Sequence, residues 1–339
     1  MAAARIAING LGRIGRAALK IALETPELEV VGVNDVASPE AIAYLLRHDT
    51  VYGRLQQEVS ARGDRLVVGA RGIRSTHERE PLQLPWRELR VDVVLECTGA
   101  FRSRDDLEKH IRAGAGAVIL SAPAKDPEVP TVVHGVNRAD GSIRTISCAS
   151  CTTNCITPLA EIMDRRIGVR KAVMTTIHAY TSSQAIVDAP RGHLERGRAG
   201  AANLVPTSTG AAAATARALP SLRGRFDGVA VRAPVPVGSI ADVVFLAARR
   251  TSADEVNGIF LEEAQSDRYR GVLGVSDEPM VSSDIVRDAR AAVVDLGMTR
   301  VIDDDLVKIM AWYDNEWGYA SQMIREAVQL AGSMTTRKS

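Results

Sequence analysis

The first half of the chain alternates short apolar runs with stretches of helical spacing. Residues 5–9, 28–34, 91–97 and 117–121 are apolar and β-rich, which predicts four strands. Between them, residues 14–23 repeat apolar side chains on one helical face, and residues 104–113 form a charged helical stretch. This alternation predicts right-handed crossovers and a parallel sheet covered by helices on both faces.

The pattern changes after residue 151. Longer apolar runs at 171–179, 226–237, 241–248 and 307–313 predict a mainly antiparallel sheet backed by helices. Residues 182–205 contain few apolar side chains, so we expect a long ordered loop there, a feature that is usually functional. The 339 residues suffice for two domains, and the fold class is therefore α/β for the first and α+β for the second.

Composition narrows the choice of function. A net charge of +1 gives no global attraction to nucleic acid or an anionic membrane, and no apolar run reaches the roughly 18 residues of a membrane span. The N-terminus lacks the succession of charged, apolar and cleavage-site segments of a secretory signal, and three of the four cysteines lie within eight residues, so we expect a reducing, cytoplasmic setting.

The histidines are scattered, and Cys148 and Cys151 form a zinc half-site without a second pair, so we expect no metal.

A glycine-rich turn follows the first predicted strand and opens the first helix. In it, Gly10, Gly12 and Gly15 have the spacing that binds a dinucleotide pyrophosphate at a helix N-terminus. Asp35 ends the second strand about 20 residues later, where a carboxylate can bind a ribose 2′-hydroxyl and repel a 2′-phosphate. The pattern indicates a Rossmann-type domain that prefers NAD to NADP. A glycine turn beside a solvated aspartate is the alternative.

The densest chemistry lies at residues 148–155, Cys-Ala-Ser-Cys-Thr-Thr-Asn-Cys. A predicted strand at 141–146 enters this stretch and a predicted helix at 156–167 leaves it. A cysteine at a helix start lies where backbone N–H groups stabilise a thiolate, so Cys151 is a candidate nucleophile. A buried cysteine beside a helix cap is the alternative reading.

The remaining candidate groups are a base and several anion donors. His178 is near the end of a predicted strand and could pair with Cys151, although a lone histidine is more often a core residue. Arg196, Arg198 and Arg232 supply guanidinium groups, and residues 207–210, Thr-Ser-Thr-Gly, supply hydroxyls. Together they indicate a phosphorylated substrate, although the hydroxyls could simply cap a helix at 211–218.

From residue 8 to about 327 the chain resembles phosphorylating glyceraldehyde-3-phosphate dehydrogenases. The motifs that carry the resemblance are Ile-Asn-Gly-Leu-Gly-Arg-Ile-Gly-Arg (8–16), Val-Asn-Asp (33–35), Ala-Ser-Cys-Thr-Thr-Asn-Cys (149–155), Thr-Thr-Ile-His-Ala-Tyr-Thr (175–181), Thr-Ser-Thr-Gly-Ala-Ala (207–212) and Trp-Tyr-Asp-Asn-Glu-Trp-Gly-Tyr (312–319). The resemblance implies an NAD-binding domain at 1–150 and 318–339, because the last helix would return to it, and a catalytic domain at 151–317.

The resemblance also implies roles. Cys151 would attack the aldehyde of glyceraldehyde 3-phosphate, and His178 would activate the thiol and assist hydride transfer. Thr181 and Arg232 would hold the substrate's phosphate, and inorganic phosphate would bind Ser150, Thr152, Arg196, Thr209 and Gly210. The NAD site would comprise Gly10, Leu11, Gly12, Arg13, Ile14, Gly15, Asp35, Arg79, Thr98, Gly99, Ser121, Asn315 and Tyr319. The protein would be a homotetramer in which the 182–205 loop lines a neighbour's cofactor pocket.

Some positions depart from the family pattern. Cys148 stands where asparagine is common, Glu195 where a basic residue is common, and Ala213 where lysine is common; the small Ala189 weakens the preference for NAD. Erythrose-4-phosphate dehydrogenase is the alternative enzyme, and a binding protein without activity is the alternative class. Whether Cys148 acts as a resolving thiol, and whether the metabolic direction is glycolytic or biosynthetic, stay open.

Overall fold

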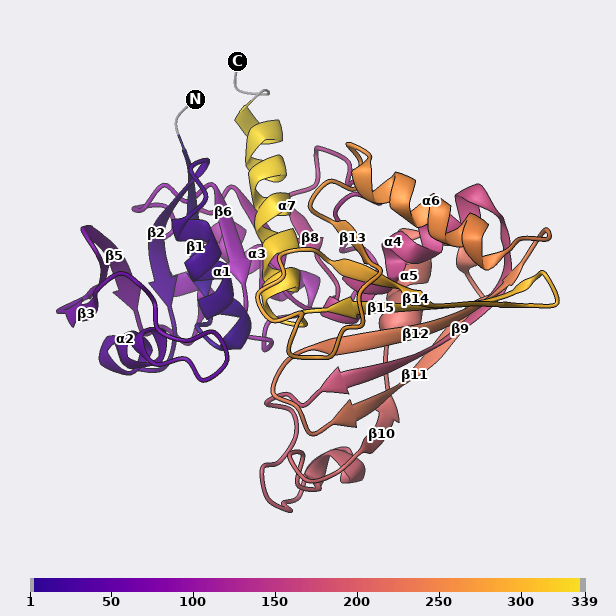
Figure 1. Ribbon diagram of the computed structural model, residues 1–339. Coiled ribbons are helices and arrows are strands. Elements are labelled where there is room, and N and C mark those ends of the chain that lie inside the picture. The colour runs from indigo at the N-terminus through magenta and orange to yellow at the C-terminus, as the bar shows by residue number, and fades with distance from the viewer. Residues whose placement is uncertain (1–2, 336–339) are drawn as a thin grey trace. The chain divides into compact units, whose positions relative to one another are not determined.

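The computed structural model describes residues 3–335. The chain divides into two compact units, each with its own sheet (Figure 1). Within the described residues, the first unit contains residues 3–132, 138–149 and 323–335, and the second contains residues 133–137 and 150–322. Among residues 3–335 no helix combines the length and the apolar character needed to cross a membrane.

The first unit is built on an eight-stranded sheet of order β3-β4-β5-β2-β1-β6-β7-β8. The pairs from β5 to β8 are parallel, and β3 and β4 add antiparallel strands at one edge. Its elements are β1 (Ala4–Asn9), α1 (Arg13–Leu23), β2 (Leu28–Asn34), α2 (Pro39–Arg47), β3 (Val59–Arg62), β4 (Arg65–Val68), β5 (Arg71–Thr76), β6 (Val93–Glu96), α3 (Arg104–Arg112), β7 (Ala117–Leu120) and β8 (Thr145–Ser147).

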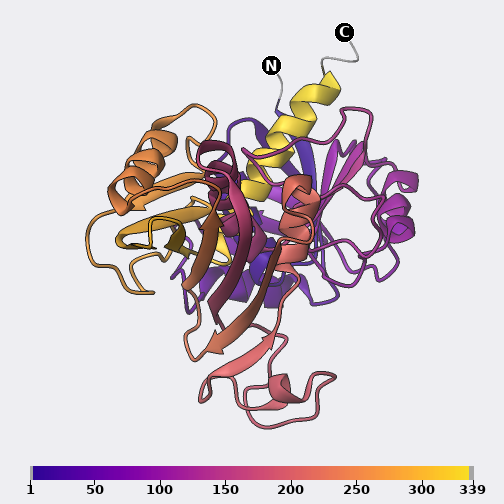
Figure 2. The same ribbon diagram turned by 90° about the vertical axis from the view of Figure 1, so that its right-hand side faces the viewer.

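The strand order places the helices of this unit on both faces of the sheet. The crossover through α1 runs from β1 to β2, and that through α3 runs the opposite way, from β6 to β7. Because both crossovers are right-handed, α1 and α3 lie on opposite faces, as Figures 1 and 2 show. The strands β6 and β7 are buried along their whole length, which is why they read as continuous apolar runs.

The second unit holds a seven-stranded sheet of order β10-β11-β9-β12-β15-β14-β13. Four of its six strand pairs are antiparallel; β11 with β9 and β13 with β14 are parallel. The elements are α4 (Cys151–Arg166), β9 (Val169–Ala179), β10 (Val205–Ser208), α5 (Ala211–Ala218), β11 (Phe226–Ala233), β12 (Ser239–Ala247), α6 (Ala253–Gln265), β13 (Leu273–Ser276), β14 (Ala292–Ile302) and β15 (Leu306–Tyr313); α7 (Trp317–Thr335) runs from this unit into the first.

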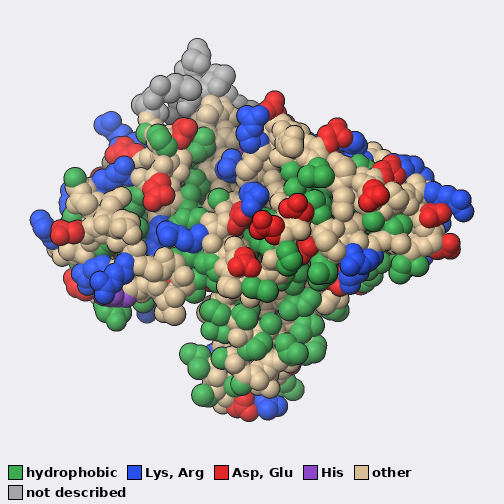
Figure 3. Space-filling view, in the orientation of Figure 1, with side chains coloured by type: hydrophobic (Ala, Val, Ile, Leu, Met, Phe, Trp, Pro, Cys, Tyr) green, Lys and Arg blue, Asp and Glu red, His purple; other side chains and the backbone are tan. Residues whose placement is uncertain are grey.

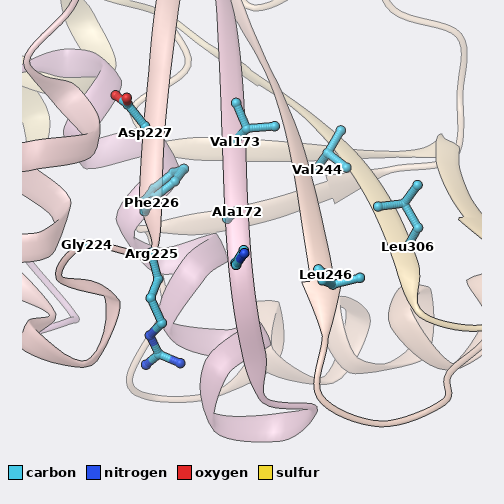
Figure 4. A pocket seen from close by; sticks show the side chains of 10 residues that line it. Ala172, Val173, Gly224, Arg225, Phe226, Asp227, Val244, Leu246 and Leu306 are labelled. Atoms are coloured by element: carbon cyan, nitrogen blue, oxygen red, sulfur yellow. The ribbon is translucent and has the colours of Figure 1, made fainter.

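One face of this second sheet is the core of the unit. The helices α4, α5 and α6 pack on it, and along β12 every second residue is buried against them. The intervening side chains lie on the opposite face, which no element of this unit covers and which is hollowed between β9, β11 and β12 (Figure 4). This alternation is typical of an antiparallel sheet with one buried face.

The predicted fold class is confirmed, while several elements differ from the pattern-based prediction. Residues 141–142 lie in a turn and residues 143–144 are irregular, so β8 begins only at Thr145. The helix expected from residue 156 begins at Cys151, and β11 ends at Ala233 because Pro234 and Pro236 cannot donate to a ladder. The expected 182–205 loop includes the short 3₁₀ helix η2 (Leu194–Gly197). The helices and strands absent from the prediction are α2, β3, β4, β5, β10, α6, β13 and β14.

Candidate active site and dinucleotide pocket

The glycine turn of the first unit has the geometry of an anion site. Gly10 has φ +92°, and a Cβ there would lie 2.6 Å from the Thr98 nitrogen. A Cβ at Gly15 would lie 1.9 Å from the Gly10 oxygen, so helix and turn pack only without side chains. Gly12 caps α1 with no side-chain bond, and the space beside it is open. The α1 N-terminus is therefore exposed to a ligand where a phosphate would bind.

A pocket of about 400 Å³ lies beside this turn at the carboxyl ends of β1, β2 and β6. The Asp35 carboxylate at its rim accepts the Leu11 N–H at 2.6 Å and the Ala37 N–H at 2.9 Å. A rigid carboxylate at this place fits a ribose diol. The lining residues are Asn9, Gly10, Gly12, Asn34, Asp35, Val36, Glu78, Arg79, Cys97, Thr98, Ala100 and Phe101.

The other residues of the first unit that are expected to bind the cofactor lie near this pocket without lining it. The Arg13 guanidinium bonds Asp49 at 3.0 Å and lies over the Tyr52 ring. Ser121 hydrogen-bonds Cys97, and burial raises the pKa of that thiol to about 12. The remaining members of this group are Leu11 and Ile14, which flank Gly12 and Gly15, and Gly99 in the turn after β6.

The second unit brings Cys151 and His178 together. Cys151 is the first residue of α4, where the Ser150 hydroxyl caps the helix by accepting the Thr153 N–H at 3.1 Å. His178 is the penultimate residue of β9, and its Nε2 lies 3.2 Å from the Cys151 Sγ. Its Nδ1 lies 2.7 Å from the Ala179 oxygen. In the tautomer that donates its Nδ1 proton to the Ala179 oxygen, Nε2 is free to accept the thiol proton.

Burial pushes each of these two groups towards its neutral form. Desolvation raises the pKa of the Cys151 thiol, against the lowering by Arg232 and by the Thr152 N–H. Desolvation, then the charge of Arg232, lowers the pKa of His178 to about 3. The expectation that the helix start stabilises Cys151 as a thiolate of lowered pKa is wrong, because desolvation raises the pKa by more than the helix terminus and Arg232 lower it. The two groups must ionise together, as a thiolate beside an imidazolium.

Two guanidinium groups face this pair. The Arg232 Nη1 lies 3.1 Å from the Ala179 oxygen and 2.6 Å from the His178 Nδ1, while its buried Nε has no hydrogen-bond partner among the described residues. Arg196 donates to the Thr207 hydroxyl at 3.0 Å, and its charge contributes to the lowered pKa of His178. Arg198, in contrast, pairs with Asp188 at the surface. An unsatisfied guanidinium nitrogen beside the nucleophile is the feature expected of an anion site.

The hydroxyl groups expected at this site have different environments. Thr181 is partly exposed at the end of β9, where its hydroxyl lies 2.9 Å from that of Ser183. Thr209 and Gly210 precede α5, and the Thr209 hydroxyl accepts the Ala211 N–H at 3.2 Å. Thr152 is buried with its hydroxyl 2.9 Å from that of Tyr313, so it is bonded within the protein.

Two hydrogen bonds determine which way the side-chain amide of Asn315 is oriented. Its Oδ1 accepts the Ser239 hydroxyl at 2.9 Å and the Gly238 N–H at 3.1 Å. Because both partners donate, the Nδ2 is left to bond another group. The Ser239 hydroxyl also accepts the Ala179 N–H at 3.1 Å, which links Asn315 to the residue after His178. Tyr319 is buried in the first turns of α7.

Sequence reasoning missed two residues that support the site. Tyr313 has a buried hydroxyl hydrogen-bonded to Thr152 and Thr176. Its ring packs edge-on against the His178 ring, with 6.0 Å between the two ring centroids. Ser239 orients Asn315 as described above. Tyr313 lies within the recognised motif 312–319, whereas Ser239 begins a strand with no distinguishing pattern.

The comparisons with known proteins agree over nearly the full chain. Residues 4–104 match the family described as "Glyceraldehyde 3-phosphate dehydrogenase, NAD binding domain", and residues 150–315 match the corresponding C-terminal domain. The chain is 46% identical to glyceraldehyde-3-phosphate dehydrogenase 2 of Streptomyces avermitilis, over 94% of this chain and 96% of that one. It is 46% identical to the glyceraldehyde-3-phosphate dehydrogenase of Mycobacterium tuberculosis (97% and 98%) and 41% identical to that of Zymomonas mobilis (98% and 100%).

Proposed function

Because the chain belongs to the glyceraldehyde-3-phosphate dehydrogenase family, we propose that it catalyses the NAD-dependent oxidative phosphorylation of glyceraldehyde 3-phosphate to 1,3-bisphosphoglycerate. The observation that carries the proposal is the Cys151 thiol 3.2 Å from the His178 Nε2, beside the Arg232 guanidinium, whose buried Nε has no partner among the described residues. A nucleophile, a base and an anion donor together are what covalent oxidation of a phosphorylated aldehyde requires.

The reaction begins with a bond from the Cys151 Sγ to the aldehyde carbon. The thiol proton passes to the His178 Nε2 and then to the new alkoxide, which gives a thiohemiacetal. His178 takes this hydroxyl proton back as hydride leaves the same carbon, and the product is a thioester. NAD, when bound, supplies the hydride acceptor. Inorganic phosphate then attacks the thioester carbon, and Cys151 leaves as a thiolate beside the imidazolium.

The anion donors divide between two phosphates. Arg232 and Thr181 hold the phosphate of the substrate, while Arg196, Thr209, Gly210 and Ser150 hold the attacking phosphate. Thr152 contributes its backbone N–H, since its hydroxyl is bonded to Tyr313. A phosphate at Arg232 also offsets the positive charge that lowers the pKa of His178, so substrate binding makes His178 a stronger base.

The residues of the first unit fit NAD. The open space at Gly12 and the exposed α1 N-terminus suit a pyrophosphate, and Asp35 suits a ribose 2′-hydroxyl. Asn315 would bind the nicotinamide amide through its Nδ2, with Tyr319 nearby. We assign residues 1–150 and 318–339 to the NAD-binding domain and 151–317 to the catalytic domain. The use of a reactive thiolate favours a reducing cytoplasm.

A homotetramer is part of the proposal. The uncovered face of the second sheet is apolar at Val173, Val244, Leu246 and Leu306, around a hollow of about 600 Å³ (Figure 4). Figure 3 shows hydrophobic side chains gathered over the lower part of the molecule in that view, which includes β10 and the segment 182–205. In that segment Ile186 and Leu194 are each 85% exposed. A second copy that covers these surfaces would remove the apolar area from water; the mass of the native protein in solution tests the assembly.

The decisive experiment is an aldehyde-dependent assay of NADH formation with and without inorganic phosphate. We expect turnover with glyceraldehyde 3-phosphate to require phosphate and to yield an acyl phosphate. Turnover without phosphate that yields free acid, or a preference for erythrose 4-phosphate, would support the alternative enzyme. Absence of NADH under all conditions, with NAD and substrate both bound, would identify a binding protein without activity.

A further inference from the structure

A buried carboxylate that the proposed reaction does not use lies beside the dinucleotide pocket. Glu96 ends β6 with no exposed surface, and it accepts four hydrogen bonds. Its Oε1 accepts the Thr98 N–H at 2.8 Å and also the Thr98 hydroxyl. Its Oε2 accepts the Asn9 amide at 2.5 Å, and the His110 Nε2 lies 3.1 Å away. Two of these partners, Asn9 and Thr98, line the pocket.

Two backbone or side-chain groups that can only donate, the Trp86 indole N–H and the Glu78 N–H, determine the direction of the hydrogen bonds from His110 and Asn9 to Glu96. The Trp86 indole N–H can only donate, and it lies 3.0 Å from the His110 Nδ1, so the His110 proton is on Nε2 and points to Glu96. At the other end, the Glu78 N–H donates to the Asn34 Oδ1 at 2.9 Å. The Asn34 Nδ2 therefore donates to the Asn9 Oδ1 at 2.8 Å, which leaves the Asn9 Nδ2 to donate to Glu96.

The same carboxylate also determines the shape of one pocket wall. The Thr98 hydroxyl donates to Glu96 and accepts the Ala100 N–H at 3.1 Å, which holds the turn that follows β6. Ala100 and Phe101 of this turn line the pocket. The Thr98 nitrogen is the atom that approaches the Gly10 Cβ position most closely, so the turn packs directly on the glycine turn.

We propose that Glu96 is a positioning residue for cofactor binding, kept in place by His110 and Trp86, which holds the 97–101 turn and Asn9 against the glycine turn. The inference rests on the proposed function, since the ligand in question is NAD. A glutamine cannot replace Glu96: its NH₂ group would face either the Thr98 N–H or the fixed donors of Asn9 and His110. His110 cannot turn its proton away without losing the bond from the Trp86 N–H, and the Asn9 amide cannot flip unless Asn34 flips and loses the bond from the Glu78 N–H.

The test measures NAD binding by calorimetry, together with the KM values and thermal stability, in Glu96→Gln. We expect the Kd and the KM for NAD to rise roughly 10–100-fold, the worth of one or two charge-assisted bonds. The Kd for AMP should rise by the same factor, and the KM for the aldehyde should change less than twofold. Glu161→Gln is the matched control, because Glu161 is a buried carboxylate bonded to Tyr269 and Arg165 in the second unit. It should lower stability and leave the Kd for NAD within twofold of wild type.

Trp86→Phe decides the question if Glu96→Gln does not fold. Trp86 does not line the pocket, and phenylalanine removes the donor that fixes the His110 tautomer. Because phenylalanine also leaves a smaller ring in the core, thermal stability should fall, and the Kd for NAD is measured on the folded fraction, where a two- to fivefold rise is expected through Glu96. The inference is overturned if wild type binds NAD and the Kd for NAD in Glu96→Gln and Trp86→Phe stays within twofold of wild type. It is also overturned if Glu161→Gln weakens NAD binding as much as Glu96→Gln does. A wild type that binds no NAD would instead overturn the proposed function, and this inference with it.

Discussion

Replacing His178 by asparagine tests how the Cys151 thiolate forms. In this site burial raises the pKa of the thiol above its usual value of 9.0, so a thiol without a base should remain protonated at neutral pH. Because burial raises this pKa, only a small fraction of Cys151 would be thiolate at pH 7 without a base. His178 is the only group described within hydrogen-bond distance of the Sγ that can take its proton.

The assay is the rate of iodoacetamide alkylation at Cys151, followed by mass spectrometry from pH 5 to pH 10. In wild type we expect rapid alkylation at pH 7, because the pair ionises as a unit. In His178→Asn the rate at pH 7 should fall about 100-fold, the usual worth of a positioned base, and should recover only at alkaline pH, where the buried thiol loses its proton. His193→Asn, whose side chain is 62% exposed, is the control and should match wild type. A His178→Asn rate within threefold of wild type at pH 7 would refute the argument that desolvation controls this thiol.

Three further outcomes follow from the same geometry. Asp35→Ala should raise kcat/KM for NADP at least tenfold relative to NAD, because a carboxylate that repels a 2′-phosphate is removed; unchanged cofactor preference in steady-state kinetics would show that Asp35 does not face the ribose. Arg196→Ala should raise the KM for inorganic phosphate more than the KM for the aldehyde, and equal increases would argue against separate phosphate sites. Cys148→Ser should recover from peroxide treatment followed by reductant as completely as wild type, because Cys148 is buried with its thiol pKa raised well above 9.0; poorer recovery of activity in the variant would make Cys148 a resolving thiol.

Local pattern determined most of the first unit. The glycine spacing at Gly10, Gly12 and Gly15 reflects packing between adjacent segments, and the structure shows the close approaches that exclude side chains there. The buried parallel strands could be found because both of their faces are covered, which produces continuous apolar runs. The antiparallel edge strands β3 and β4 were not found, since short, half-exposed strands carry little hydrophobic signal.

The sequence by itself also determined which residue types carry the chemistry, because motifs around Cys151 and His178 retain their order and spacing. Only the tertiary structure decided the protonation state of these two groups and the distance between them. The pKa of a thiol depends on how much water surrounds it, and a sequence separation of 27 between Cys151 and His178 says nothing of the 3.2 Å between their reacting atoms. The same holds for Glu96, whose partners come from β1, α3 and the turn after β6. Burial and hydrogen-bond direction are properties of groups brought together by folding, and no local pattern encodes them.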